Sequence, residues 1–167
     1  MVIGIWIVVF GVVYNIHRQR DWIDPIRFFT QTLMYAPNNV RAINSLGISY
    51  AERNDFNKAI ETYNKGISLN SSFPNFYHNI GMAYKGQKRY RKAEEYYFKA
   101  LYVYPHFNYS INALVFLAEM YANNNELSEA LRLYKKLLLR IPPKQDGHIQ
   151  VERRIYELEQ KQNEKTN

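Results

Sequence analysis

The side chains that could do chemistry are scattered along this sequence. The histidines stand alone, and no two have the spacing of metal ligands: His17, His78, His106 and His148. Glu94 and Glu95 are adjacent, so on a helix they would point to different faces rather than act together as an acid and a base. The chain has no cysteine and no glycine-rich phosphate loop. We therefore expect no catalytic residue, no metal, no cofactor, and a protein that is not an enzyme.

Basic residues form one run and one helical stripe: Lys88, Arg89, Arg91 and Lys92, and Arg132, Lys136 and Arg140. Either set could meet nucleic acid or anionic lipid, but such sets are more often solvated helix faces that carry paired charges. We expect nucleic acid not to be a partner. The 22 basic and 15 acidic residues give a net charge of +7, which would favour acidic partners or an anionic membrane surface without identifying either.

The elements that position these side chains follow an internal repeat. Apolar residues make up 47% of the 167, which is typical of a chain that folds around a core. Three columns recur at spacings of 34 and then 37 residues: Tyr50, Tyr84 and Tyr121; Ala59, Ala93 and Ala130; Tyr63, Tyr97 and Tyr134. Because the columns shift together, the unit is copied whole, and the three extra residues lie between the second and third copies, around residues 106–110.

Within each copy, the apolar spacing predicts two amphipathic helices. In the first copy Ile43, Leu46 and Tyr50 follow a helical period, and residues 56–63 repeat it. Polar pairs predict the turns between the helices: Asn54-Asp55, Gln87-Lys88 and Asn124-Asn125. Small residues mark positions where two helices approach closely: Gly47, Gly81 and Ala118, with Ala59, Ala93 and Ala130. Pro105 and Pro142 are expected to end the second helices of copies two and three.

These spacings carry a family signature. It reads Leu46-Gly47-x-x-Tyr50, Ile80-Gly81-x-x-Tyr84 and Leu117-Ala118-x-x-Tyr121 in the three copies. The sequence resembles the tetratricopeptide-repeat (TPR) family over residues 40–144, with repeats at 40–73, 74–107 and 111–144. The resemblance implies an all-α fold, a TPR α-solenoid of antiparallel helix pairs, that binds protein or peptide ligands in a concave groove.

Both ends of the repeat region predict covering elements. Residues 18–39 are interpreted as a juxtamembrane segment and a half repeat, with Asp24 as the N-cap and Pro25 as the first residue of its helix. Residues 145–167 are interpreted as a charged capping helix with a polar tail. The apolar residues expected to cover the last hydrophobic face are Ile149, Ile155 and Leu158.

The N-terminal stretch predicts a membrane anchor, taken as residues 1–17, because residues 2–16 contain no charge. As a helix, this stretch would reach only about 24 Å of the roughly 30 Å hydrocarbon core. A secretory signal peptide is an alternative, although neither a basic n-region nor a cleavage site is seen. A buried strand is another, but no second such run could pair with it. Arg18 and Arg20 follow the stretch, so the positive-inside rule would place the repeats in the cytoplasm.

The junction after this stretch resembles a second group of proteins. Arg18-x-Arg20-x-Trp22, Ala36-Pro37-Asn38-Asn39 and Leu46-Gly47 are similar to the end of polytopic membrane glycosyltransferase-like proteins with C-terminal TPRs. That resemblance implies a C-terminal piece of a longer protein, with its repeats on the luminal or periplasmic side. Two hypotheses stay open: a single-pass membrane-anchored TPR scaffold for protein–protein interaction, and the TPR arm of such a glycosyltransferase-like protein.

The family's ligand groove is lined by the second, fifth, ninth and twelfth positions of each first helix. The resemblance assigns these positions to Arg41, Asn44, Ile48 and Ala51; Asn75, His78, Met82 and Lys85; and Asn112, Val115, Glu119 and Ala122. Amide side chains there could hold an extended peptide backbone, and the aliphatic ones could offer apolar contacts. Solvated side chains that bind nothing tightly fit the pattern equally well. Recognition of chaperone C-termini is not expected, because only Asn79 matches the required carboxylate clamp.

Overall fold

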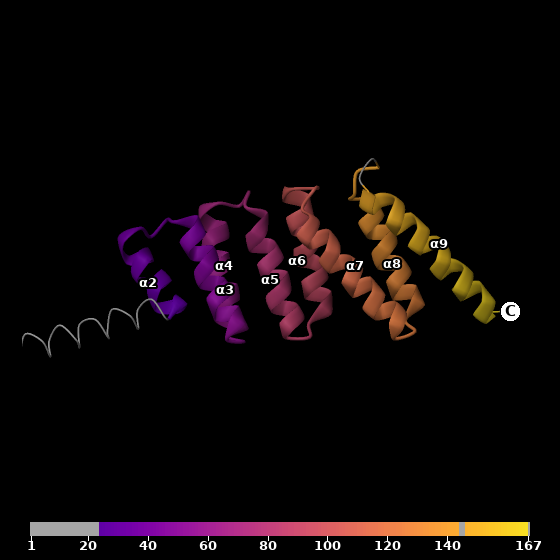
Figure 1. The fold of residues 1–167 in the computed structure, drawn as a ribbon, viewed down its shortest axis with the longest axis horizontal. Coiled ribbons are helices and arrows are strands. Elements are labelled where there is room, and N and C mark those ends of the chain that lie inside the picture. Colours follow the sequence, from indigo (N-terminus) through magenta and orange to yellow (C-terminus); the bar gives the residue numbers. More distant parts are fainter. Residues whose placement is uncertain (1–23, 144–145, 167) are drawn as a thin grey trace, which may run out of the picture. The chain divides into compact units, whose positions relative to one another are not determined.

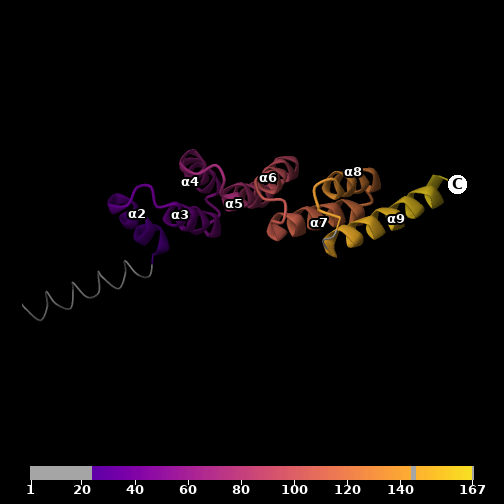
Figure 2. The same cartoon turned by 90° about the horizontal axis from the view of Figure 1, so that it is seen from above.

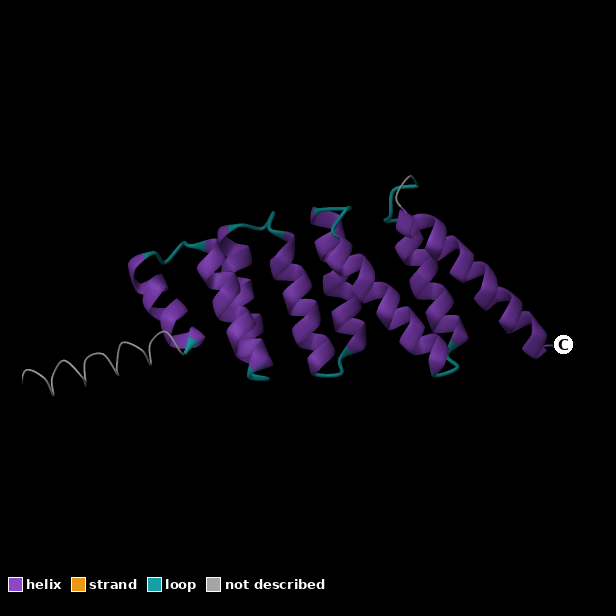
Figure 3. Ribbon diagram, in the orientation of Figure 1, coloured by secondary structure: helices purple, strands orange, loops and turns teal. Residues whose placement is uncertain are grey.

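The computed structural model describes residues 24–143 and 146–166, and in these two ranges every regular element is an α-helix (Figure 3). Within these ranges, eight helices follow one another (Figure 1): α2 Pro25–Tyr35, α3 Val40–Glu52, α4 Phe56–Leu69, α5 Pro74–Gly86, α6 Tyr90–Val103, α7 Asn108–Asn123, α8 Leu127–Leu138 and α9 Asp146–Thr166. The prediction of an all-α helical repeat is confirmed. The chain divides into two units, α2–α4 up to Leu69 and α5–α9 from Asn70, and each is described by itself.

The predicted membrane anchor at residues 1–17 lies outside the described residues. Among the helices that are described, none combines the length and the apolar character that crossing a bilayer requires. The structure therefore bears on the repeat region and on the helices that flank it.

The same turn joins the two helices of each repeat. One residue of each predicted turn pair adopts a left-handed conformation, with φ of 60° at Asn54, 59° at Lys88 and 67° at Asn125. The N–H of the next residue then donates to a carbonyl five positions earlier, at 2.9 Å in all three copies. The three accepting carbonyls belong to the first tyrosine column: Tyr50, Tyr84 and Tyr121. Asparagine tolerates this conformation well, and Lys88 adopts it where glycine is usual.

The rings of the second tyrosine column leave no room for a side chain at Gly47 and Gly81. A Cβ added to Gly81 would lie 2.5 Å from Cε1 of Tyr97, and one added to Gly47 would overlap the ring of Tyr63. Both rings are almost fully buried. In copies one and two, the first helix can therefore lie directly on the tyrosine ring of the second helix only because glycine has no side chain.

Unit 1 contains the half repeat and the first full repeat. The Asp24 carboxylate caps α2 by accepting a backbone hydrogen bond at 3.1 Å, and Pro25 occupies the first turn. Arg53, just after α3, forms an ion pair with Asp24 at 2.8 Å and so links the two helices. Helix α2 has no fully buried residue, and its last turn exposes Met34 and Tyr35 by 76% and 91%.

Unit 2 contains two full repeats and the last helix. Consecutive helices of this unit pack against each other, and in Figure 2 helices α7 and α9 form one row while α6 and α8 form another. Helix α7 has 16 residues where α3 and α5 have 13 each. The three extra residues, 108–110, are therefore helical and lengthen α7 at its start.

The apolar stripe of α9 differs from the expected one. Val151, Ile155 and Leu158 are buried, whereas Ile149 is 58% exposed. Ile149 lies two residues from Val151, which is about 200° around a helix, so it cannot share that face. Expecting Ile149 to cover the last hydrophobic surface was wrong.

Candidate binding surface on the first helices

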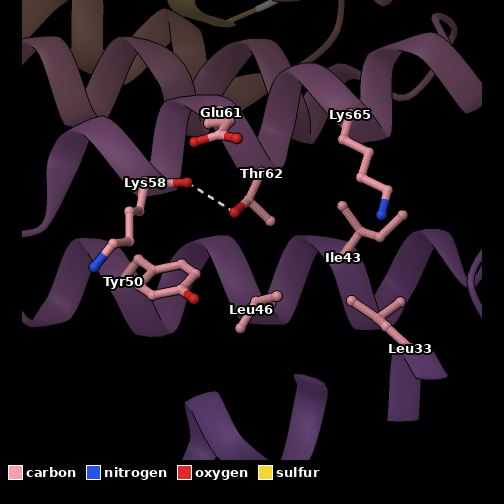
Figure 4. Close-up of a pocket in the computed structure, with 8 residues that line it drawn as sticks. All are labelled: Leu33, Ile43, Leu46, Tyr50, Lys58, Glu61, Thr62 and Lys65. Atoms are coloured by element: carbon pink, nitrogen blue, oxygen red, sulfur yellow. Dashed lines mark hydrogen bonds between the residues drawn. The ribbon is translucent and has the colours of Figure 1, made fainter. Parts of the chain in front are cut away.

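In unit 1, the predicted groove residues lie along α3. Arg41 is exposed, Asn44 is half-buried, and Ile48 is 38% exposed. They do not line the cleft that the described residues of α2, α3 and α4 form in this unit. That cleft, about 240 Å³ in volume, is lined by Leu33 of α2, by Ile43, Leu46 and Tyr50 of α3, and by Lys58, Glu61, Thr62 and Lys65 of α4 (Figure 4). The sequence did not point to it, because these positions are either core positions or polar positions of the second helix.

In repeat 2, the predicted groove residues lie along α5. Met82 is 43% exposed, and its sulfur accepts a hydrogen bond from the hydroxyl of Tyr97 at 3.3 Å. The ammonium of Lys85 lies 4.1 Å from the centre of the Phe116 ring on α7, a cation–π contact. Asn75 is half-buried at the start of the helix. Met82 is the exposed apolar side chain of this part of the surface.

His78 is not a free groove residue. Its ring lies among three aromatic rings, with centroids 5.4 Å from Tyr97, 5.6 Å from Phe107 and 6.0 Å from Tyr109. Its Nδ1 is 3.1 Å from the hydroxyl oxygen of the fully buried Ser110. Burial lowers the pKa of His78 to about 4, and the charge of Lys85 acts in the same direction. His78 therefore stays neutral near pH 7 and joins α5 to α7.

In repeat 3, the predicted groove residues line a cleft together with α9. This cleft has a volume of about 270 Å³ and is lined by Ile111, Asn112, Val115 and Glu119 of α7, by Tyr134 of α8, and by Gly147, Gln150, Val151 and Arg154 of α9. The structure thus brings Asn112, Val115 and Glu119 together. The lining residues from α9 were missed, because the sequence suggested only a covering role for that helix.

An ion pair joins the two walls of this cleft. Arg154 donates to both oxygens of Glu119 at 2.7 Å, and the Tyr134 hydroxyl donates to the same carboxylate at 2.5 Å. The Arg154 hydrogen bonds lower the pKa of Glu119, while its partial burial acts in the opposite direction. Burial, followed by the nearby carboxylate, raises the pKa of Tyr134 above its ordinary value. Glu119 is consequently ionised and already neutralised within the protein.

Two of the predicted basic residues serve a buried carboxylate rather than a solvated face. Arg132 donates to both oxygens of Glu94, and Lys136 donates to one of them at 3.0 Å. The Glu94 side chain is only 6% exposed, and its burial would raise its pKa, but the hydrogen bonds from both cations outweigh burial and lower it. Glu95 is exposed and pairs with Lys99 at 2.7 Å. Arg132 and Lys136, which were expected to belong to a solvated helix face, therefore connect α8 to α6 through Glu94.

Antiparallel helix pairs, repeated turns and glycine-on-tyrosine packing define this chain as an α-helical repeat protein. One family model, described as TPR repeat, matches residues 47–88, and models of the tetratricopeptide repeat match residues 74–107 and 113–148. The chain belongs to the tetratricopeptide-repeat family and carries three TPR motifs. TPR domains typically bind protein or peptide partners.

Sequence relatives resemble this chain over only part of their length. The protein O-mannosyl-transferase TMTC3 of Mus musculus is 25% identical over 147 residues, which make up 81% of this chain and 16% of that protein. The Homo sapiens protein of the same name is 25% identical over 145 residues, with 80% and 16% covered. The chain therefore spans about a sixth of the length of these relatives.

Solved structures share the fold. The crystal structure of MamA superposes with a TM-score of 0.55 at 22% identity, covering 88% of this chain and 95% of that chain. The N-terminal domain of stress-induced protein-1 (STI-1) from C. elegans superposes with a TM-score of 0.54 at 23% identity, covering 72% and 94%. At these identities the likeness establishes a common helical repeat and nothing about ligands.

Proposed function

We propose that this protein is a membrane-tethered TPR scaffold that binds a segment of another protein on its first helices. The observation that carries the proposal is that a first helix in each unit exposes an apolar side chain among polar ones: Ile48 on α3 of unit 1 is 38% exposed, and Met82 on α5 of unit 2 is 43% exposed. Exposed apolar side chains beside amides suit an extended peptide, which needs both apolar anchors and backbone hydrogen bonds. In this proposal the repeats bind and position a partner and catalyse nothing themselves.

The tether in this proposal is the uncharged stretch at residues 2–16. Arg18 and Arg20 follow it directly, which suits an end of a span that meets lipid headgroups. Extraction of native membranes with alkaline carbonate tests the tether, because a membrane-spanning protein stays in the pellet. Release of the protein into the supernatant would rule the tether out.

A second candidate function is favoured by the resemblance to protein O-mannosyl-transferase TMTC3, which extends over 81% of this chain. Here the repeats would form the TPR arm of a longer polytopic glycosyltransferase-like protein. The gene sequence before the codon for Met1 distinguishes the candidates, since an in-frame run of further apolar spans would favour the arm. Protease treatment of sealed vesicles adds a second criterion, because the arm would be luminal or periplasmic whereas the charge rule places the scaffold in the cytoplasm.

Site-specific photocrosslinking tests the binding surface without assuming a partner. A benzophenone amino acid in place of Met82 should capture a discrete protein adduct in native membranes, because Met82 is exposed on a first helix. The matched control places the same group at Tyr102, which is 80% exposed on the second helix α6. Equal capture from both positions would count against a binding surface on the first helices.

A further inference from the structure

The cleft between α7 and α9 is lined by apolar side chains, two amides and a pair of opposite charges. We propose that it binds an extended, uncharged peptide segment, which inserts one aliphatic side chain between the two helices. This inference rests on the proposed function, since it names the place on the TPR surface and the chemistry of the ligand. It also makes α9 one wall of the site.

The floor of the cleft is apolar. Ile111 from α7 and Val151 from α9 are 5% and 3% exposed, and Val115 lies half-buried beside them. The volume of about 270 Å³ falls just below the roughly 300–1,000 Å³ of sites for drug-sized molecules. The space therefore suits one aliphatic side chain with its adjoining peptide groups rather than a nucleotide or another large cofactor.

Two amide side chains stand on opposite walls of the cleft. Asn112 projects from α7 and Gln150 from α9, and both are exposed. Among the side chains that the structure describes, neither amide has a hydrogen-bond partner. Each amide offers donors and an acceptor, which matches the alternating N–H and C=O groups of an extended peptide.

The charges of the cleft favour an uncharged occupant. The described residues that line it include one carboxylate, Glu119, and one guanidinium, Arg154, and these bind each other through two hydrogen bonds of 2.7 Å. Arg154 donates a further hydrogen bond of 2.9 Å to Glu157, and Glu119 accepts one from Tyr134. A charged ligand would lose hydration and find no unpaired counter-charge in the lining, so an uncharged segment is preferred.

Gly147 leaves the cleft open and offers a way to close it. A Cβ added at this position would meet no atom within 4 Å, so a larger side chain can enter the cleft without strain. Gly147→Leu should fill the space that the ligand needs. The matched control is Gln160→Leu, which adds the same side chain at an exposed position of α9 that does not line the cleft.

A random decapeptide phage library, selected on the full chain in lipid nanodiscs, provides the probe. The selected peptides should share one aliphatic residue within an uncharged stretch. Synthetic copies, titrated by fluorescence anisotropy, should bind Gly147→Leu at least tenfold more weakly than the unaltered chain. Asn112→Ala with Gln150→Ala should weaken binding to a similar degree, and Gln160→Leu should leave it within twofold. Circular dichroism checks that each variant is folded.

Three results would overturn the inference: selection of no peptide, selection of charged peptides, or unchanged affinity in folded Gly147→Leu. Peptides that bind Gly147→Leu normally but lose affinity for Met82→Asp would refute the cleft as the site while leaving the TPR surface as a binding surface. Absence of a specific crosslink from position 82 is the separate outcome that contradicts the proposed function.

Discussion

Two junctions in unit 2 differ in what fills them. Between α5 and α7, the His78 ring packs against Phe107 and Tyr109 and meets the hydroxyl of Ser110. Between α7 and α9, the side chains leave a cleft of about 270 Å³ that the Glu119–Arg154 ion pair spans. The first junction is closed by aromatic rings, whereas the second is open.

The difference originates in how the following helix begins. Helix α7 starts three residues early, and the added turn supplies Tyr109 and Ser110, both of which meet His78. Helix α9 starts with Asp146 and Gly147, and Gly147 has no side chain to enter the junction. One helical architecture can therefore form either a packed junction or an open cleft, depending on a few residues at the start of a helix.

The largest expected effect comes from opening the closed junction. Phe107 is 8% exposed, and its ring centroid lies 5.6 Å from His78 and 5.5 Å from Tyr109. Phe107→Ala should lower the free energy of unfolding by about 3 kcal/mol, because it removes a buried ring and leaves a cavity. Urea denaturation followed by circular dichroism measures the loss. Phe107→Leu keeps most of the apolar volume and should cost less than about 1.5 kcal/mol. Equal losses would contradict the cavity explanation, because leucine fills most of the space that alanine leaves empty.

The next largest effect is expected in the pH dependence of stability, because the closed junction contains a histidine, His78, whose pKa is lowered. The pKa of His78 is about 4 in the folded protein and about 6.5 in the unfolded chain. Below pH 6.5 the unfolded chain therefore takes up a proton that the folded protein does not, and stability falls as the pH drops toward 4. The loss should total about 2 kcal/mol over this window, allowing for the partial exposure of the ring.

His78→Phe provides the control for this pH effect, because it keeps a ring in the cluster and removes the titrating group. Between pH 6.5 and 5 its unfolding free energy should stay nearly constant, since carboxylates titrate at lower pH. Thermal denaturation at half-unit pH steps measures both slopes. A variant that keeps the full slope of the unaltered chain would show that another group is responsible.

Much of the fold could be predicted from the sequence, because the residues that determine it lie close together in the chain and recur in each repeat. The spacing of Gly47 and Gly81 from the second tyrosine column marks a contact that tolerates no side chain, and the structure shows the clash that enforces it. The turns could also be predicted from their polar residue pairs, since asparagine readily adopts the left-handed backbone conformation that the turn requires. That Lys88 takes this conformation in copy two follows from the tertiary repeat and not from its own preference.

The candidate binding surface was harder to predict, because it depends on contacts between elements. His78 occupies a family groove position, yet the turn at residues 108–110 buries it in a ring cluster. Arg132 was expected to lie on a solvated helix face, because its partner Glu94 is 38 residues earlier and on another helix, which the sequence does not show. The sequence did not indicate that Gln150 and Arg154 would line a cleft, since the family's groove positions end with the last repeat. Such pairings become visible only when the helices are placed against each other.

The smallest effect is expected at the open junction, where a partly exposed ion pair, rather than a cluster of aromatic rings, joins the two helices. The Arg154 and Glu119 side chains are 34% and 33% exposed, so water can solvate Glu119 when its partner is removed. Arg154→Met, which keeps much of the side-chain length, should cost about 1 kcal/mol and increase amide hydrogen exchange along α9. Arg153→Met on the neighbouring exposed position of α9 should change neither measurement. A loss of 3 kcal/mol or more for Arg154→Met would mean that Glu119 becomes an unpaired buried charge, and the second junction would then be as closed as the first.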